Sequence, residues 1–295
     1  MNARALPVVI GVDGSAASQN AIRWGIALAE RRESAVQLLH AYDPTINETR
    51  IGEGFRVSVL AAVHDAARDQ LESARAQAVE IQPGLALTTR LVEDSAATAL
   101  IGASFAAEAV VVGAQGASGF SALVAGSTAM NVATHARGSV VIVPASESAA
   151  HDGSGVVVGV DGSALSDAAI GFAFREAAET GGSLTAVLAW TEPLTWAVIA
   201  AALPTHQTTG HLQQAHEQLL TWVQPWSEKY PDVRVHRRVV NDLPARALAA
   251  ASEGAQLLVV GCRGRRAVSS MMLGSVSHGV LHLATCPVAV VHAGC

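Results

Sequence analysis

The chain repeats itself, and this repeat constrains its fold more than any other feature. The segment Val8–Ala16, VVIGVDGSA, returns 148 positions later as Val156–Ala164, VVVGVDGSA. Gly113 and Gly261 keep the same interval near the other end of the repeat. One register maintained over so long a stretch predicts a tandem duplication.

Two domains are therefore expected within the 295 residues, close to the usual domain size of about 100–150 residues. We place the first at residues 1–146 and the second at residues 156–295. Residues 147–155, rich in Ser, Ala and Gly, are the expected linker.

Each copy alternates short apolar runs with longer segments of helical periodicity. Half of the residues are hydrophobic and only 4% are aromatic, an aliphatic composition typical of parallel sheets covered by helices. In the first copy the predicted strands are Val8–Val12, Val36–Ala41, Leu85–Val92, Ala109–Val112 and Val140–Val143. The predicted helices are Ala16–Arg31, with Ser15 as a cap, then Val57–Glu80, Ala96–Ala106 and Ser127–Ala136.

This alternation predicts an α/β fold made of two tandem, doubly wound domains, each with a five-stranded parallel sheet of Rossmann-like type. Ligands of such sheets bind beyond the carboxyl ends of the strands, where the strand order reverses.

Two loops share one pattern of glycines: Gly, two residues, Gly, nine residues, Gly, Ser. The first contains Gly113, Gly116 and Gly126-Ser127, and the second contains Gly261, Gly264 and Gly274-Ser275. Each follows an apolar strand and leads into a helix. Glycines let the backbone approach an anion, and a helix start offers free N–H groups, so the loops predict phosphate cradles. The alternative is that these are ordinary turn and cap glycines.

Other nucleotide motifs do not fit. A Walker loop needs a lysine after its last glycine, and the single lysine of the chain is Lys229. A GxGxxG fingerprint is expected after the first strand, where the chain instead reads Gly11-Val12-Asp13-Gly14-Ser15.

The two glycine loops, the Val-Asp-Gly-Ser that ends the first strand of each copy, and the closing Cys286–Val291 (CPVAVV) together resemble the universal stress protein family, in its tandem ATP-binding class. The resemblance covers nearly the whole chain. It implies a fold like that of the adenine nucleotide alpha hydrolases, ATP with Mg²⁺ as ligand, and a role in the response to stress or growth arrest.

The resemblance also implies roles for particular residues. The base and ribose would lie at the ends of the first two strands, and the phosphates along the glycine loop and the following helix start. The first site would comprise Gly11, Asp13, Ala41, Gly113, Gly116, Gly126, Ser127 and Thr128. The second would comprise Gly159, Asp161, Ala189, Gly261, Arg263, Gly264, Arg265, Gly274, Ser275 and Val276. Independently, a strand-end carboxylate such as Asp13 fits a ribose hydroxyl, with a helix cap as the alternative.

The first copy departs from the family at Arg137-Gly138-Ser139, where a Cys-Pro usually precedes the last strand. The family often pairs domains through that strand, so a homodimer is expected but its packing is in doubt. The second loop carries Arg263, Arg265 and Arg266, whereas the first has no charge there. We expect the second site to bind triphosphate more tightly.

Several other residues have a plain interpretation. His278 and His282 have metal-ligand spacing but no third ligand nearby, which favours surface or packing histidines. Cys262 is expected to be a small loop residue, and Met271 and Met272 to fill gaps. The tryptophans of the second copy are expected in the core or an interface: Trp190, Trp196, Trp222 and Trp226.

Bulk properties exclude some function classes. The formal net charge is −6 and no basic run is interleaved with aromatics, which argues against nucleic acid. Three cysteines without a CxxC pair indicate a reducing compartment, and no apolar run is long enough for a membrane span. We expect a cytoplasmic protein without a membrane partner.

We therefore expect a binding protein: a sensor or regulator that holds one ATP per domain and acts on an unidentified protein partner. It is not expected to be an enzyme, since no catalytic constellation accompanies the loops. A slow ATP hydrolase, a nucleotidyl transferase of related fold, or a scaffold with empty sites are the alternatives.

Overall fold

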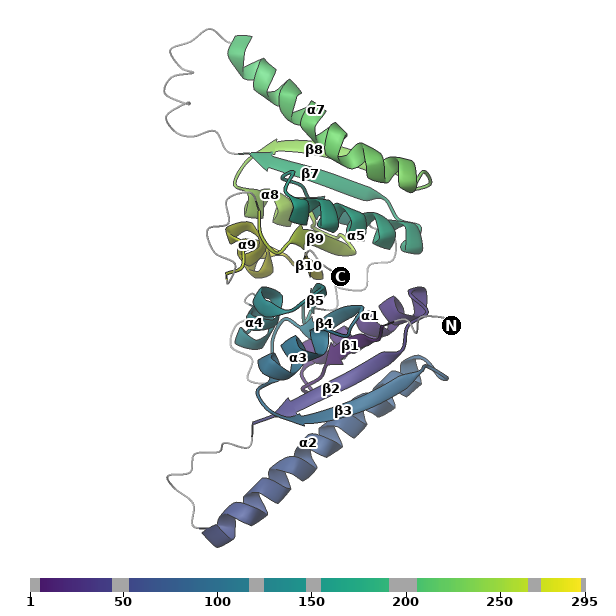
Figure 1. The fold of residues 1–295 in the computed structure, drawn as a ribbon, viewed down its shortest axis with the longest axis vertical. Helices are drawn as coiled ribbons and strands as arrows, with labels where there is room; N and C mark the ends of the chain where they lie inside the picture. Colours follow the sequence, from purple (N-terminus) through teal and green to yellow (C-terminus); the bar gives the residue numbers. More distant parts are fainter. Residues whose placement is uncertain are drawn as a thin grey trace. The chain divides into compact units, whose positions relative to one another are not determined.

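The computed structural model describes residues 6–43, 53–116, 125–146, 155–190, 206–264 and 272–292. The chain divides into two compact units, the first ending at Glu147 and the second beginning at Ser148. The division falls at the start of the predicted linker. Figure 1 shows that each unit is a sheet with helices along it.

The first unit follows the predicted alternation of strands and helices. Its strands are β1 (Val8–Gly11), β2 (Val36–Tyr42), β3 (Leu87–Glu93), β4 (Ala109–Gly113) and β5 (Ser139–Val143). Its helices are α1 (Ala16–Arg31), α2 (Glu53–Ile81), α3 (Ala96–Ser104) and α4 (Ser127–His135). The predicted bounds differ from these by a few residues; β3 begins two residues late, after a turn that contains Gly84 at φ +88° and in which the Leu85 N–H donates to the Gln82 carbonyl at 3.3 Å.

The second unit repeats the same order. Its strands are β6 (Val156–Gly159), β7 (Leu184–Trp190), β8 (Val235–Asn241), β9 (Leu257–Gly261) and β10 (Val288–Val291). Its helices are α5 (Ala164–Thr180), α7 (His206–Lys229), α8 (Pro244–Ala251) and α9 (Ser275–Leu283).

The strands within each unit are parallel. Their order is β3-β2-β1-β4-β5 in the first unit and β8-β7-β6-β9-β10 in the second. The order reverses between β1 and β4, and between β6 and β9, so a crevice opens there at the carboxyl ends of the strands. The predicted fold, two tandem doubly wound α/β domains, is confirmed.

The core of each unit lies on both faces of its central strands. Val8, Ile10 and Val111 are fully buried, because helices cover both faces: α1 and α2 pack together on one side, α3 and α4 on the other. The edge strand β3 is partly open, with residues 88–90 exposed. No helix of the described residues is long and apolar enough to span a membrane.

The helix that follows the first strand starts in the same way in both units. The Ser15 hydroxyl accepts the Ser18 N–H at 3.1 Å, which confirms the predicted cap, and Ser163 does the same for Ser166. Gly14, at φ +77°, makes the sharp turn between strand and cap that an L residue adopts only with strain. This turn brings the end of the first strand toward the crevice.

Candidate functional site

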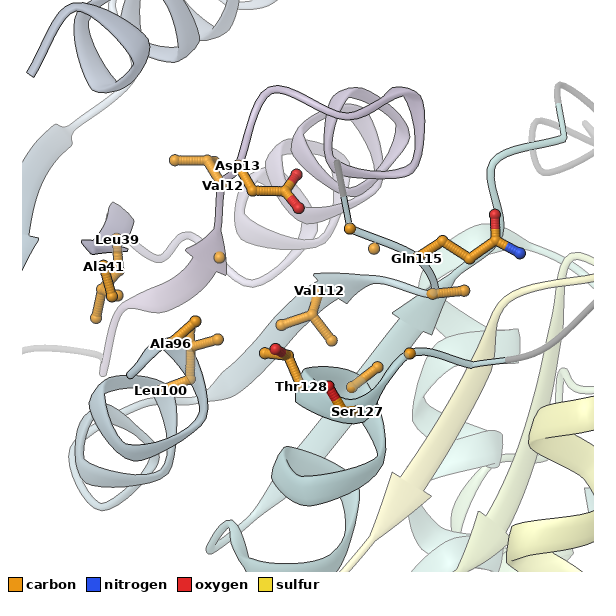
Figure 2. A pocket seen from close by; sticks show the side chains of 16 residues that line it. Val12, Asp13, Leu39, Ala41, Ala96, Leu100, Val112, Gln115, Ser127 and Thr128 are labelled. Atoms are coloured by element: carbon orange, nitrogen blue, oxygen red, sulfur yellow. The ribbon is translucent and has the colours of Figure 1, made fainter. Parts of the chain in front are cut away.

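The first unit has a pocket at the carboxyl ends of β1 and β4, with a volume of about 160 Å³. Figure 2 shows the Asp13 side chain on one side of it, and Ser127 and Thr128 at the start of α4 on another. The lining includes every residue predicted for the first site: Gly11, Asp13, Ala41, Gly113, Gly116, Gly126, Ser127 and Thr128. The structure therefore brings the predicted residues together in one place.

The second unit has the equivalent pocket, with a volume of about 720 Å³. Its lining contains nine of the ten predicted residues: Gly159, Asp161, Ala189, Gly261, Arg263, Gly264, Gly274, Ser275 and Val276. The tenth, Arg265, lies outside the described residues, as does Arg266.

The two ends of each glycine loop are tied by a backbone hydrogen bond. The Gly126 N–H donates to the Ala114 carbonyl at 2.7 Å, and the Gly274 N–H donates to the Cys262 carbonyl at 2.8 Å. This hydrogen bond fixes the last glycine of the motif beside its first two glycines.

The helix that follows each glycine loop begins without a side-chain cap. Gly126 and Gly274 are the N-cap residues of α4 and α9, and as glycines they supply no side-chain hydrogen bond to the helix start. In α1, by contrast, Ser15 satisfies this position. Uncapped N–H groups and the positive end of the helix dipole favour an anion, and Ser127 and Ser275 add exposed hydroxyls beside them.

A carboxylate stands opposite each helix start. One oxygen of Asp13 accepts the Ser15 N–H at 3.0 Å, and one oxygen of Asp161 accepts the Ser163 N–H at 2.9 Å. The capping residue is the serine, so the aspartate holds the turn before the helix rather than capping it. Its second oxygen faces the middle glycine of the loop, Gly116 or Gly264.

The first glycine of each loop also has a packing role. A Cβ atom on Gly113 would lie 2.8 Å from backbone atoms of Ala17 and Ser18 in α1, and one on Gly261 would lie 3.0 Å from the backbone of Leu165. These glycines let the first helix of the unit pack against the end of the strand. Both glycines also line the pockets, so the close approach of a phosphate to them stays a prediction.

The described tryptophans of the second unit lie in different surroundings. Trp190 was expected in the core or an interface, but it lines the second pocket. Trp226 packs against α5, where its indole N–H donates to Asp167 at 2.8 Å, and Trp222 packs on Gly162. Trp196 lies outside the described residues.

Cys262 is buried, as a small loop residue can be, and burial raises the pKa of its thiol. Met272 is largely exposed rather than filling a gap, and Met271 lies outside the described residues.

His278 and His282 face each other on α9 with ring centroids 4.6 Å apart. Among the described residues no three metal-ligating side chains of His, Cys, Asp or Glu gather in one place.

Residues of the long helices α2 and α7 reach the sites, which the sequence reasoning missed. Gln70 of α2 donates from its amide to the Asp13 carbonyl, and Gln214 and Gln218 of α7 line the second pocket. The repeat itself held a signal, since Gln218 stands 148 positions after Gln70.

Comparison with known proteins gives consistent results. The model of the universal stress protein family matches residues 6–144 and 155–292. A universal stress protein of Mycolicibacterium smegmatis is 35% identical over 288 residues, with 96% of each chain covered. One of Mycobacterium tuberculosis is 34% identical over 297 residues, again with 96% of each chain covered. The crystal structure of a universal stress protein from Archaeoglobus fulgidus shares the fold, with a TM-score of 0.69 at 18% identity over 98% of this chain and 97% of that one.

Proposed function

The chain belongs to the universal stress protein family, and we propose that it binds one ATP, with Mg²⁺, in each of its two units. We propose further that it acts as a cytoplasmic sensor or regulator of the stress response rather than as an enzyme.

One observation carries the proposal: in both units a helix start with a glycine N-cap lines the same pocket as a strand-end aspartate. The phosphates fit the uncapped N–H groups of α4 and α9 together with the Ser127 and Ser275 hydroxyls. A ribose hydroxyl can donate to the pocket-facing oxygen of Asp13 or Asp161. The base fits between the strand ends and the apolar side chains that line the pocket, such as Leu39 and Leu100 in the first unit.

Binding without turnover is favoured by the chemistry of the described pocket residues. Their carboxylates are those of Asp13 and Asp161, and each already accepts a backbone N–H within its own turn. A carboxylate fixed in this way suits recognition of a sugar better than activation of a water molecule. The rival functions are a slow ATP hydrolase, a nucleotidyl transferase and a scaffold with empty sites.

The regulatory role requires partners. A homodimer and an unidentified regulatory protein remain part of the proposal, with no role for nucleic acid or a membrane. Light scattering on the purified chain, with and without ATP, tests the dimer directly.

The function is tested by releasing the nucleotides of the freshly purified protein with heat and separating them by chromatography. Released ATP, together with turnover below about 1 s⁻¹ when ATP and Mg²⁺ are added, is the expected result. ADP with faster turnover indicates the hydrolase. No nucleotide, and no uptake at millimolar ATP, indicates the scaffold.

A further inference from the structure

The two sites differ in the way the long helix of each unit meets them. In the first unit Gln70 of α2 is half-buried and hydrogen-bonded to the Asp13 carbonyl. Its amide occupies the space directly over Gly14, where any added Cβ atom would overlap it. The helix is thereby tied to the turn that carries the candidate ribose carboxylate.

In the second unit the corresponding space, over Gly162, is occupied by the indole of Trp222. Trp222 comes 148 positions after Ala74, so it stands one helical turn beyond the equivalent of Gln70. Gln218, which is that equivalent, is exposed and lines the cavity. The large indole thus replaces the glutamine at the turn and leaves Gln218 beside the cavity.

A second contact ties α2 to the ends of β2 and β3. The Tyr42 hydroxyl, at the end of β2, donates to Glu93 at 2.6 Å and therefore accepts from the Nδ1–H of His64 on α2 at 2.7 Å. His64 and Gln70 are six positions apart on α2, so the helix is held at two points along its length.

The second unit replaces this trio by Trp190, Leu212 and Asn241 at the same interval of 148 positions. Leu212 offers no hydrogen bond, and Trp190 lines the cavity instead. The indole nitrogen of Trp190 is buried and has no hydrogen-bond partner among the residues that the structure describes, which leaves a donor at the wall of this site.

The two cavities differ in extent: Gln214, Ala215 and Gln218 of α7 line the second, whereas no described residue of α2 lines the first. At about 160 Å³ the first pocket lies below the range of roughly 300–1,000 Å³ that is usual for small-molecule sites, whereas the second, at about 720 Å³, lies within it. We propose that α2 is a latch over the first site, closed by Gln70 and His64, so that ATP fills the second unit first and enters the first only when the latch opens. This rests on the proposed function, since it takes ATP as the ligand of both sites.

A latch of this kind lowers the apparent affinity by the fraction of time the site is open. Each net hydrogen bond in a protein is worth about a two- to tenfold change in an equilibrium constant. Removing the Gln70 amide is therefore expected to raise the affinity of the first site about fivefold, and removing the Tyr42 hydroxyl as well to raise it further.

The experiment is calorimetry with ATP and Mg²⁺ in a chain whose second site is blocked by Ser275→Asp, which places a carboxylate against the phosphates. In that background Gln70→Ala and Gln70→Ala/Tyr42→Phe should tighten ATP binding, whereas Gln77→Ala, the same change two turns along α2, should not. Unchanged or weaker binding in the Gln70 variants overturns the latch. A parent chain that binds no ATP overturns the proposed function instead.

Hydrogen exchange gives a second measurement that does not depend on the variants. Saturating ATP should increase exchange in α2 between residues 64 and 74, because the latch must open, while α7 gains protection. Protection of both helices would contradict the proposal, since it would mean that α2 closes on the nucleotide.

Discussion

Gly264 lies directly against the carboxylate of Asp161: a Cβ atom on the glycine would be 2.5 Å from Oδ2. The equivalent distance from Gly116 to Asp13 Oδ2 is 3.0 Å. The strand-end carboxylate thus leaves no room for a side chain at the middle glycine of each loop, and the contact is tighter in the second unit.

Gly264→Ala should therefore push the Asp161 carboxylate away from its pocket position and weaken ATP binding to the second unit by about tenfold, the loss of one charged hydrogen bond. Gly116→Ala should have a smaller effect on the first unit, because a shift of a few tenths of an ångström accommodates it. Calorimetry with the other site blocked by Ser127→Asp or Ser275→Asp measures each separately. Equal losses in the two units would show that the tighter contact in the second unit does not set the size of the effect, and no loss in either would show that the carboxylate contact does not matter.

Gly113→Ala should act on stability before it acts on ligand binding. Its Cβ would meet the backbone of α1 at 2.8 Å, and such overpacking costs about 1–3 kcal/mol. Gly102→Ala, in α3 with nothing within 4 Å, should instead stabilise by about 0.5–1 kcal/mol. Urea unfolding of both variants without nucleotide makes the comparison, and a Gly113→Ala protein as stable as the parent would contradict it.

Arg263 lines the second pocket, and the equivalent residue in the first is Gln115. Arg263→Ala should weaken ATP binding to the second unit about tenfold and reduce its salt dependence, because one charged hydrogen bond to phosphate is worth about 1.5–3 kcal/mol. Arg263→Lys should restore the salt dependence but only part of the affinity. The titration is done in the Ser127→Asp background at two salt concentrations; identical curves for Arg263→Ala and the parent would remove this basis for unequal sites.

The hydrogen bond between Tyr42 and Glu93 has a spectroscopic signature. Donation to Glu93 raises the pKa of Tyr42 to about 12, with burial and the negative charge of Glu93 acting in the same direction. Because the folded pKa lies above the ordinary value of about 10, this contact stabilises fully below pH 10 and is lost as the pH rises through 12.

Absorbance of phenolate near 295 nm follows this titration, and the chain has only two tyrosines. A late step near pH 12 that disappears in Tyr42→Phe and moves to lower pH in Glu93→Gln is expected. A Tyr42 step unaffected by Glu93→Gln would show that the hydroxyl does not donate to this carboxylate.

Local sequence patterns predicted the overall fold. The repeat predicted two units, the apolar runs predicted the strands, and Ser15 was found from the capping preference alone. The candidate site could be predicted because its residues sit at strand ends and helix starts, which a parallel sheet brings to one edge.

Tertiary packing decided what the sequence reasoning missed. The motif predicts Gly113 as a phosphate glycine, and the structure shows that it also packs against Ala17 of α1, which no local pattern indicates. Gln70 lies over Gly14 and Trp222 lies over Gly162, which are equivalent positions in the two units, because a long helix passes beside each turn. Whether a glutamine or an indole fills such a position depends on packing between elements far apart in the chain, about which periodicity carries no information.

The central claim, one ATP in each unit, is tested most directly by the stoichiometry of ATP binding to the intact chain by calorimetry with Mg²⁺. The account predicts two molecules per chain, falling to one in Ser127→Asp and in Ser275→Asp and to none in the double variant, while Ser127→Ala/Ser275→Ala retains two. A parent chain that binds no ATP at millimolar concentration, or a double Asp variant that still binds two, would contradict it.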